Sequence, residues 1–466
     1  MVTNYNLFIN LEMQGMTTLN SGILRLSTFS QNPKGLLVVT LILIPLFVVE
    51  NLEGYLADSI VQFSVSPQGL GLYTAIFIGY LVLQHSVLNF IKHNSKLIRT
   101  KSKVIDGIQT SVFLVQYALA INLGLILVQI FMFDQYSTIS LFFPTLVALV
   151  MACVLFFVFG FQFLKWRTNI RQSLGILLFA FSFLVLGSVQ FIALPFLTLS
   201  MFQLPPLITP SSEIVPPVGI ENELLVTLID NALYLDYAAF ALMIFGTALL
   251  LWQYSRRINK AVLAVLIALP LIGYAGSDIE AFHISELEPF LQGNNYLIFL
   301  SLTSLFSWLS HSFAFLYVAH KLPNSSIKIF LYMTAIGFIL FSLSYTVDVR
   351  GGSYPPYAAN SFALFPISVY MILFGIYGSG LALSQDILLR KHIKSLARGD
   401  QGLLSSIGTA HMQNEVTRAV GEVMNVIENE EADLQQRSGL DTPMEKEDIE
   451  NYLQQLIAEF RKYPKK

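Results

Sequence analysis

The chain has 466 residues, of which 54% are apolar and only 12% are charged, and its mean hydropathy is +0.62. About a quarter of the residues of a water-soluble globular domain are charged, so a chain this poor in polar surface is predicted to be covered largely by lipid. The formal net charge is −3, and the single cysteine, Cys153, excludes an intrachain disulfide and a cysteine metal cluster.

Apolar stretches follow one another along the chain after a polar segment of residues 1–34. A helix needs about 20 mostly apolar residues to cross the hydrocarbon core, and lipid cannot satisfy the backbone, so each stretch is predicted to be a transmembrane α-helix. The sequence therefore predicts an all-α fold, a polytopic bundle of about ten spans. The predicted spans are residues 35–50, 69–91, 108–133, 138–163, 174–199, 232–253, 261–276, 296–319, 327–346 and 361–384.

Lysine and arginine residues orient this bundle. They gather in alternate connections, and the other connections contain only one basic residue, Arg350. Because cytoplasmic loops carry the excess of Lys and Arg, the pattern predicts a plasma-membrane protein with both termini in the cytoplasm. The predicted organisation is an N-terminal cytoplasmic segment (1–34), a transmembrane bundle (35–384) and a cytoplasmic amphipathic helical tail (385–466).

The connections assigned to the outer side are acidic, beginning with Glu50 and Glu53 after the first span. The loop after the seventh span brings Asp278, Glu280 and His283 within six residues of each other. Carboxylates with an imidazole can bind a divalent cation, so we consider a metal site here. The alternative is a solvated acidic loop, since the spacing matches no specific metal motif.

A stiff aromatic segment precedes the tenth span. Tyr354 and Tyr357 flank two prolines and follow Asp348 and Arg350. These residues could form the floor of an external ligand pocket. Tyrosines are also common at the membrane interface, so an anchor with a local ion pair is the alternative.

Ionisable residues inside the predicted spans are few. His85 and His311 lie in the inner parts of the second and eighth spans, and Asp236 lies near the outer end of the sixth. Two imidazoles from separate helices could ligate a haem, and Asp236 could bind a cation or a proton. The histidines could equally form hydrogen bonds between helices. Apart from haem or a divalent metal, we expect no cofactor.

Prolines interrupt several spans, at Pro45, Pro144, Pro270 and Pro366. Transporters use broken helices near the midplane to expose backbone groups to a substrate. We find no lysine, arginine or glutamate at the middle of a predicted span, which argues against an ion-coupled carrier. The proline pattern therefore leaves a carrier as one hypothesis.

The tail is predicted to be helical and amphipathic. Its last helix places one apolar stripe on a face, formed by Leu453, Leu456, Ile457 and Phe460. Such a stripe must be covered, so we expect a cytoplasmic protein partner or self-association. The basic start of the tail would meet anionic lipid headgroups, and no nucleic-acid partner is expected.

The segment Ser353–Ser379, which begins with SYPPY, and the tail residues 406–412 (SIGTAHM) are similar to uncharacterised polytopic membrane proteins of ammonia-oxidising archaea. The likeness covers the last 120 or so residues, and Ala358 stands where a glycine is expected. The resemblance implies an archaeal plasma membrane and carries no assigned activity.

Three hypotheses for function remain at this point. The elaborated outer loops and the tail favour a receptor or adaptor. Ten spans, interrupting prolines and an acidic outer face favour a carrier for a small solute or cation. His85 and His311 leave open a haem- or metal-binding redox subunit. No catalytic arrangement of side chains predicts an enzyme.

Overall fold

The computed structural model describes residues 29–97, 103–169, 174–202, 204–210, 223–253, 260–277, 294–322, 326–345 and 354–385. The chain divides into two compact units, Met1–Gly408 and Thr409–Lys466, and all described residues belong to the first. The predicted tail stripe and the predicted acidic loop at 278–288 lie outside the described residues.

The described part is an all-α bundle. Its main helices are α2 (Pro33–Ser64), α3 (Pro67–Asn94), α4 (Lys103–Phe133), α5 (Thr138–Asn169), α6 (Leu174–Phe202), α7 (Glu223–Gln253), α8 (Lys260–Ser277), α9 (Asn294–Lys321), α10 (Ser326–Tyr345) and α12 (Phe365–Gln385). The short elements are η1 (Ser95–Leu97), α11 (Ala359–Ala363), β1 (Tyr136–Ser137) and β2 (Leu207–Ile208).

The helices confirm the prediction of a helical membrane protein. Within the described residues, eight helices are long and apolar enough to cross a membrane. The apolar part of α8, Lys260–Leu271, is shorter than a span. Each of the ten predicted stretches coincides with a helix, while the number that cross the bilayer stays a prediction.

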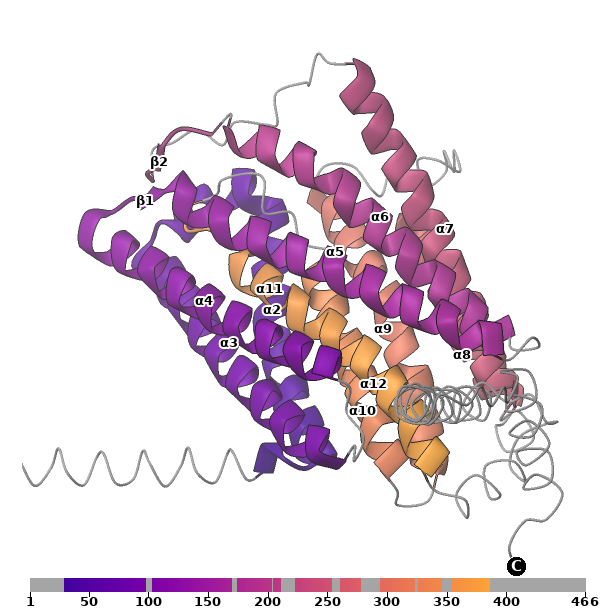
Figure 1. Cartoon of the computed structure of the whole chain (residues 1–466). Coiled ribbons are helices and arrows are strands. Elements are labelled where there is room, and N and C mark those ends of the chain that lie inside the picture. Colours follow the sequence, from indigo (N-terminus) through magenta and orange to yellow (C-terminus); the bar gives the residue numbers. More distant parts are fainter. Residues whose placement is uncertain are drawn as a thin grey trace, which may run out of the picture. The chain divides into compact units, whose positions relative to one another are not determined.

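The centre of the bundle is formed by α10 and α12, which pack against each other (Figure 1). In the most apolar stretch of α10, 83% of the residues are buried, and the value for the segment Ala359–Ala382, which contains α11 and most of α12, is 94%. The corresponding value for α4 is 28%. Helices α9 and α2 cover α10, and α5 and α4 cover α12, while α5, α6 and α7 pack in sequence order. The two central helices are therefore enclosed by protein, whereas α4 presents most of its surface to lipid.

Glycines bring the backbones of α10 and α12 together. A Cβ at Gly375 would lie 2.3 Å from Thr334 Oγ1 and 2.7 Å from Thr334 N. A Cβ at Gly337 would lie 2.8 Å from Ile372 N. Small residues of this kind allow transmembrane helices to approach closely, because association in lipid depends on packing rather than on hydrophobic burial.

A short antiparallel ribbon closes one end of the bundle. β1 follows α4 and pairs with β2, with Tyr136 opposite Ile208. The Thr138 backbone N–H donates to Pro206 O at 3.1 Å, and the Thr138 hydroxyl donates to Pro205 O. These contacts tie the α4–α5 turn to the segment after α6.

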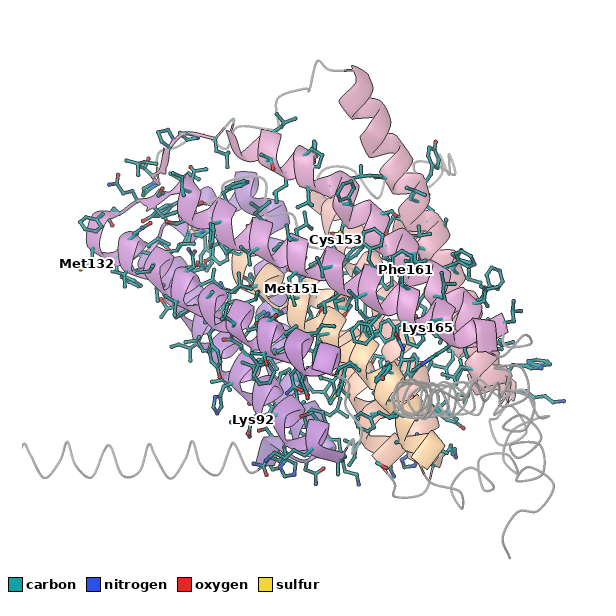
Figure 2. The ribbon with its side chains drawn as sticks, in the orientation of Figure 1. Lys92, Met132, Met151, Cys153, Phe161 and Lys165 are labelled. Carbon is teal, nitrogen blue, oxygen red and sulfur yellow. The ribbon has the colours of Figure 1, made fainter. Side chains whose placement is uncertain are left out.

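Two basic side chains lie near the ends of their helices. Figure 2 labels Lys92 near the end of α3 at the lower left of the view, Lys165 near the end of α5 on the right, and Met132 at the left edge. That all basic clusters share one end of the bundle, as the alternation of Lys and Arg predicts, stays a prediction. Which side of the membrane this end faces remains a prediction.

The first predicted span, residues 35–50, agrees with the candidate span Pro33–Leu52. The acidic residues Glu50 and Glu53 were expected in an outer loop, but α2 continues to Ser64, so that both are helical. The helix persists because no proline follows Pro45 until Pro67, which starts α3 behind the N-cap Ser66. Pro366 also differs from expectation, since it lies in the first turn of α12 rather than inside a helix.

Candidate functional site

The first polar centre joins α7 to α10 through Asp236. The Tyr345 hydroxyl donates a hydrogen bond of 2.5 Å to Asp236 Oδ1. Asp236 is partly exposed, and no other described residue forms a hydrogen bond with it. One carboxylate oxygen is thus left without a described protein partner, in a part of α7 that belongs to a candidate span.

Aromatic rings adjoin this carboxylate. The Trp308 ring on α9 lies 5.4 Å from Tyr345 and 5.0 Å from Phe240, centroid to centroid. Phe240 follows Asp236 by four residues on α7, which places the two side chains on one face of the helix. We call Asp236, Tyr345, Trp308, Phe240 and His311 the Asp236 centre.

His311 forms the inner part of this centre and is completely buried. Its Nδ1 lies 3.1 Å from Thr247 Oγ1 of α7, and its Nε2 has no hydrogen-bond partner among the described residues. The rings of Phe240, Trp308 and Phe338 surround the imidazole at 5.4 to 5.8 Å. Residues of α7, α9 and α10 therefore surround His311, and the same three helices supply Asp236, Trp308 and Tyr345.

The second polar centre is built around Glu50, which is fully buried in α2. Glu50 Oε1 accepts hydrogen bonds from Asn360 N (3.1 Å) and Asn360 Nδ2 (3.0 Å). Glu50 Oε2 accepts from Ser361 N (3.0 Å) and Ser361 Oγ (2.5 Å). Both donor residues belong to α11, so the carboxylate holds this short helix against α2.

The surroundings of Glu50 tie several helices together. Asn51 Nδ2 donates to Leu343 O of α10 at 3.0 Å. The Tyr357 hydroxyl donates to Gly69 O of α3 at 2.8 Å, and the Tyr357 ring packs edge-on against Tyr73 at 5.6 Å. We call Glu50, Asn360, Ser361, Tyr73 and Asn51 the Glu50 centre.

The entry to α11 has an unusual backbone. Ala358 precedes the helix at φ 83° and ψ −24°, in the left-handed region that favours glycine. This is the position where the resemblance led us to expect a glycine. The alanine side chain is tolerated here with some strain, because the neighbouring contacts of Tyr357 and Asn360 fix the segment.

The structure brings together only part of the predicted site. Asp236 and His311 share one centre, whereas the His85 side chain on α3 is exposed. Every contact given above for His311 is with α7, α9 or α10, so the described residues do not pair the two imidazoles as a haem site would require. The remaining predicted residues, which lie outside the described part, are Asp278, Glu280, His283, Asp348, Arg350, Leu453, Leu456, Ile457 and Phe460.

The predicted tyrosines pack into the protein. Tyr357 is buried, and Tyr354 stacks on Tyr136 of β1 at 6.2 Å. Burial, followed by the nearby Asp134 carboxylate, raises the pKa of Tyr354, and burial raises the pKa of Tyr136 well above its usual value. Both phenols therefore stay neutral at physiological pH and serve as packing groups at this end of the bundle.

Sequence reasoning missed Glu50 as a site residue. One signal in the sequence could have indicated that Glu50 lies within a helix. Glu50 directly follows an apolar run, and Leu52, Tyr55 and Leu56 continue the apolar pattern after it at helical spacing. Its partners Asn360 and Ser361 are 310 and 311 residues away along the chain. No pattern in the local sequence predicts a contact between residues so far apart in the chain.

Metal binding was a further prediction for this chain. Within the described residues, no group of three or more His, Cys, Asp and Glu side chains is placed to hold a metal ion. The residues predicted as ligands lie outside that part, so a divalent-metal site stays a prediction. No known family model matches the chain, and neither a curated protein nor a solved structure shows significant similarity to it.

Proposed function

We propose that this chain is a multi-pass membrane protein that carries a small organic cation, which it recognises at the Asp236 centre. The observation that carries the proposal is the Asp236 carboxylate, which has one hydrogen bond from Tyr345 and lies beside the rings of a membrane-embedded bundle. A carboxylate inside a span is costly and defaults to a functional role.

The chemistry of the centre favours a poorly hydrated cation. Aromatic faces attract cations through their quadrupoles, by about 0.5 to 2 kcal/mol for each ring. Trp308 and Tyr345 supply such rings next to a negative charge, and no described lysine or arginine is paired with Asp236. A quaternary ammonium group would therefore gain both the charge attraction and the ring contacts.

The proposed topology gives the centre a direction. With ten spans and both termini in the cytoplasm, Asp236 would face the outer half of the membrane and His311 would lie deeper on the same helices. The plasma membrane is part of this proposal and rests on the distribution of Lys and Arg. An archaeal origin is likewise proposed on the resemblance alone.

The test uses Trp308 as an internal probe. The chain has three tryptophans, so replacing Trp166 and Trp252 by Phe leaves Trp308 as the only one. In proteoliposomes, tetramethylammonium should change Trp308 emission and radiolabelled tetramethylammonium should be taken up. Asp236→Asn should abolish both signals. Asp134→Asn is the control, because it replaces a carboxylate in the turn after α4, outside the Asp236 centre, and it should leave both signals unchanged. Equal signals with and without Asp236 would contradict the proposal.

A receptor or adaptor is the second proposed function. It is supported by the enclosed pair α10 and α12, a close-packed core that suits a scaffold better than a moving path. The outer loops and the tail that would bind ligand and partner lie outside the described residues. Tetramethylammonium binding that needs Asp236 but occurs without uptake would favour this function over the carrier.

A further inference from the structure

We propose that the Glu50 centre is a proton-binding site, at which Glu50 takes up and releases a proton while it remains inside the bundle. The proposal goes beyond cation recognition at Asp236, because it names the ion that could drive a carrier. It does not depend on that function, since proton uptake at Glu50 can be measured with no organic cation present.

The first argument is the composition of the Glu50 surroundings. All four groups that donate to the carboxylate are neutral, two from the backbone and two from the side chains of Asn360 and Ser361. The titratable side chains described around it are Tyr73 from α3 and Tyr357 from the segment before α11. No described lysine, arginine or histidine compensates its charge. A charge buried without a counter-charge favours its neutral form, which for a carboxylate requires a proton.

The second argument is a group of buried polar atoms that lack partners. The Tyr73 hydroxyl, Asn360 Oδ1 and Asn51 Oδ1 have no hydrogen-bond partner among the described residues. Tyr73 is almost completely buried, and its ring packs edge-on against Tyr357, which precedes α11. A purely structural clamp would be expected to satisfy its buried polar atoms. Free donors and acceptors beside a carboxylate are what a water molecule or a moving proton needs.

The third argument is a pair of polar contacts that connects the end of α11, next to the donors of Glu50, with α4 and α3. Gln116 Nε2 of α4 donates to Ala363 O, the carbonyl at the break between α11 and α12, at 3.0 Å. Gln84 Nε2 of α3 donates to Gln116 O at 2.5 Å. Gln116 Oε1 and the Tyr370 hydroxyl of α12, both buried, have no described partner. Polar contacts thus continue from α11 to α4 and α3.

The proton step conserves every atom. A hydronium ion of the solvent gives up its proton to Oε2 of Glu50 and is left as water, and the new O–H donates to Ser361 Oγ. The Ser361 hydroxyl rotates from donor to acceptor, so the short hydrogen bond is kept with its direction reversed. The carboxylic acid accepts less strongly than the carboxylate from Asn360 N and Nδ2, so the hold on α11 weakens. Release of the proton restores the four original hydrogen bonds.

Infrared difference spectroscopy of the full chain in lipid nanodiscs tests this step. Spectra recorded at stepped pH, over the range in which the protein stays folded, should show the C=O band of a buried protonated carboxyl group. The band should disappear in Glu50→Gln and persist in Asp134→Asn and Asp236→Asn. If no titrating carboxyl band depends on Glu50, this residue is a permanently charged clamp and the proposal is wrong.

A second variant keeps Glu50 in place, in case Glu50→Gln folds poorly. Ser361→Ala removes one hydrogen-bond partner of the carboxyl group, so the band should move to higher frequency. Ser368→Ala is the matched control, because its hydroxyl donates to Phe365 O within α12, and it should leave the band unmoved. A band that ignores Ser361→Ala belongs to another acid and overturns the proposal. Because tetramethylammonium binding is measured separately at Asp236, failure of either proposal is recognised independently.

Discussion

The carboxylates of Glu50 and Asp236 differ in their burial and in the number of hydrogen bonds that they accept. Glu50 is fully buried and receives four hydrogen bonds from one short helix, whereas Asp236 is partly exposed and receives one, from Tyr345. Glu50 holds α11 against α2, and Asp236 binds the Tyr345 hydroxyl of α10, whose ring lies 5.4 Å from that of Trp308 on α9. An acidic residue in a membrane bundle can therefore organise its surroundings or remain open to a ligand, and its number of protein donors separates the two roles.

The largest expected effect comes from removing the Glu50 carboxylate. Glu50→Leu leaves four buried donors without an acceptor, and breaking such a network costs about 3 to 5 kcal/mol. Asp236→Leu removes the acceptor of a single donor, so its cost should be about 1.5 kcal/mol. Thermal unfolding midpoints in detergent should therefore fall much further for Glu50→Leu. Equal losses would end the distinction between the two centres.

Gly375→Ala is expected to have the next largest effect, because it tests the core on which the Glu50 centre rests. The new Cβ would lie 2.3 Å from Thr334 Oγ1 and 2.7 Å from Thr334 N, and a backbone atom cannot give way as a side chain can. Overpacking of this kind costs about 3 kcal/mol. Gly71→Ala is the control, since nothing lies within 4 Å of its Cβ position, and it should leave the unfolding midpoint close to that of wild type.

Ala358 tests whether the entry to α11 is strained. Ala358→Val places a β-branched residue at φ 83°, which should cost about 2 kcal/mol. Ala358→Gly relieves the backbone but loses a buried methyl group, so its stability should stay within about 1 kcal/mol of wild type. A midpoint for the valine variant as high as that of the glycine variant would show that the segment adopts another backbone conformation.

Tyr345→Phe removes the one described donor of Asp236 and keeps the ring. A hydrogen bond to a charged group is worth about 1.5 kcal/mol, and thermal unfolding should show a loss of that size. Tetramethylammonium binding should survive, because the carboxylate and the aromatic faces remain. Tyr332→Phe, which lies on α10 outside the Asp236 centre, serves as a control for loss of a phenol hydroxyl.

His311→Phe is expected to have the smallest effect on stability. It replaces a buried imidazole whose Nε2 has no described partner by a ring of similar size among Phe240, Trp308 and Phe338. The lost hydrogen bond to Thr247 and the removed unpaired nitrogen offset each other, so the change should be below about 1 kcal/mol. If tetramethylammonium uptake then stops while binding at Asp236 persists, His311 takes part in the passage of the cation.

Hydrophobic runs predicted the fold well because lipid requires long apolar helices, and all ten predicted stretches are helical. The misses lie where long-range contacts override the local signal. Glu50 stays helical and buried because Asn360 and Ser361, distant in sequence, satisfy it. The break between α11 and α12 is likewise invisible in a continuous apolar run.

The candidate site could be predicted only in fragments. Asp236 and His311 stood out because ionisable residues are rare in spans. Their connection through Tyr345 and Trp308 could not be predicted, since aromatic residues are frequent throughout this chain and only the packing of α7, α9 and α10 selects these two. The sequence pattern identifies ionisable residues whose burial in a span is energetically unfavourable, whereas the residues that contact them are known only from the tertiary structure.

The enclosure of α12 has a consequence for how the protein is made. This helix follows all the other described helices in the chain, yet it occupies the centre of the bundle, and 94% of the most apolar stretch of Ala359–Ala382 is buried. The described helices synthesised earlier therefore leave the face of α10 that carries Gly337 and Thr334 uncovered until α12 follows them into the membrane. During that interval Glu50 has none of its α11 donors, so the nascent chain carries an unsatisfied carboxylate that only the arrival of α11 and α12 can cover.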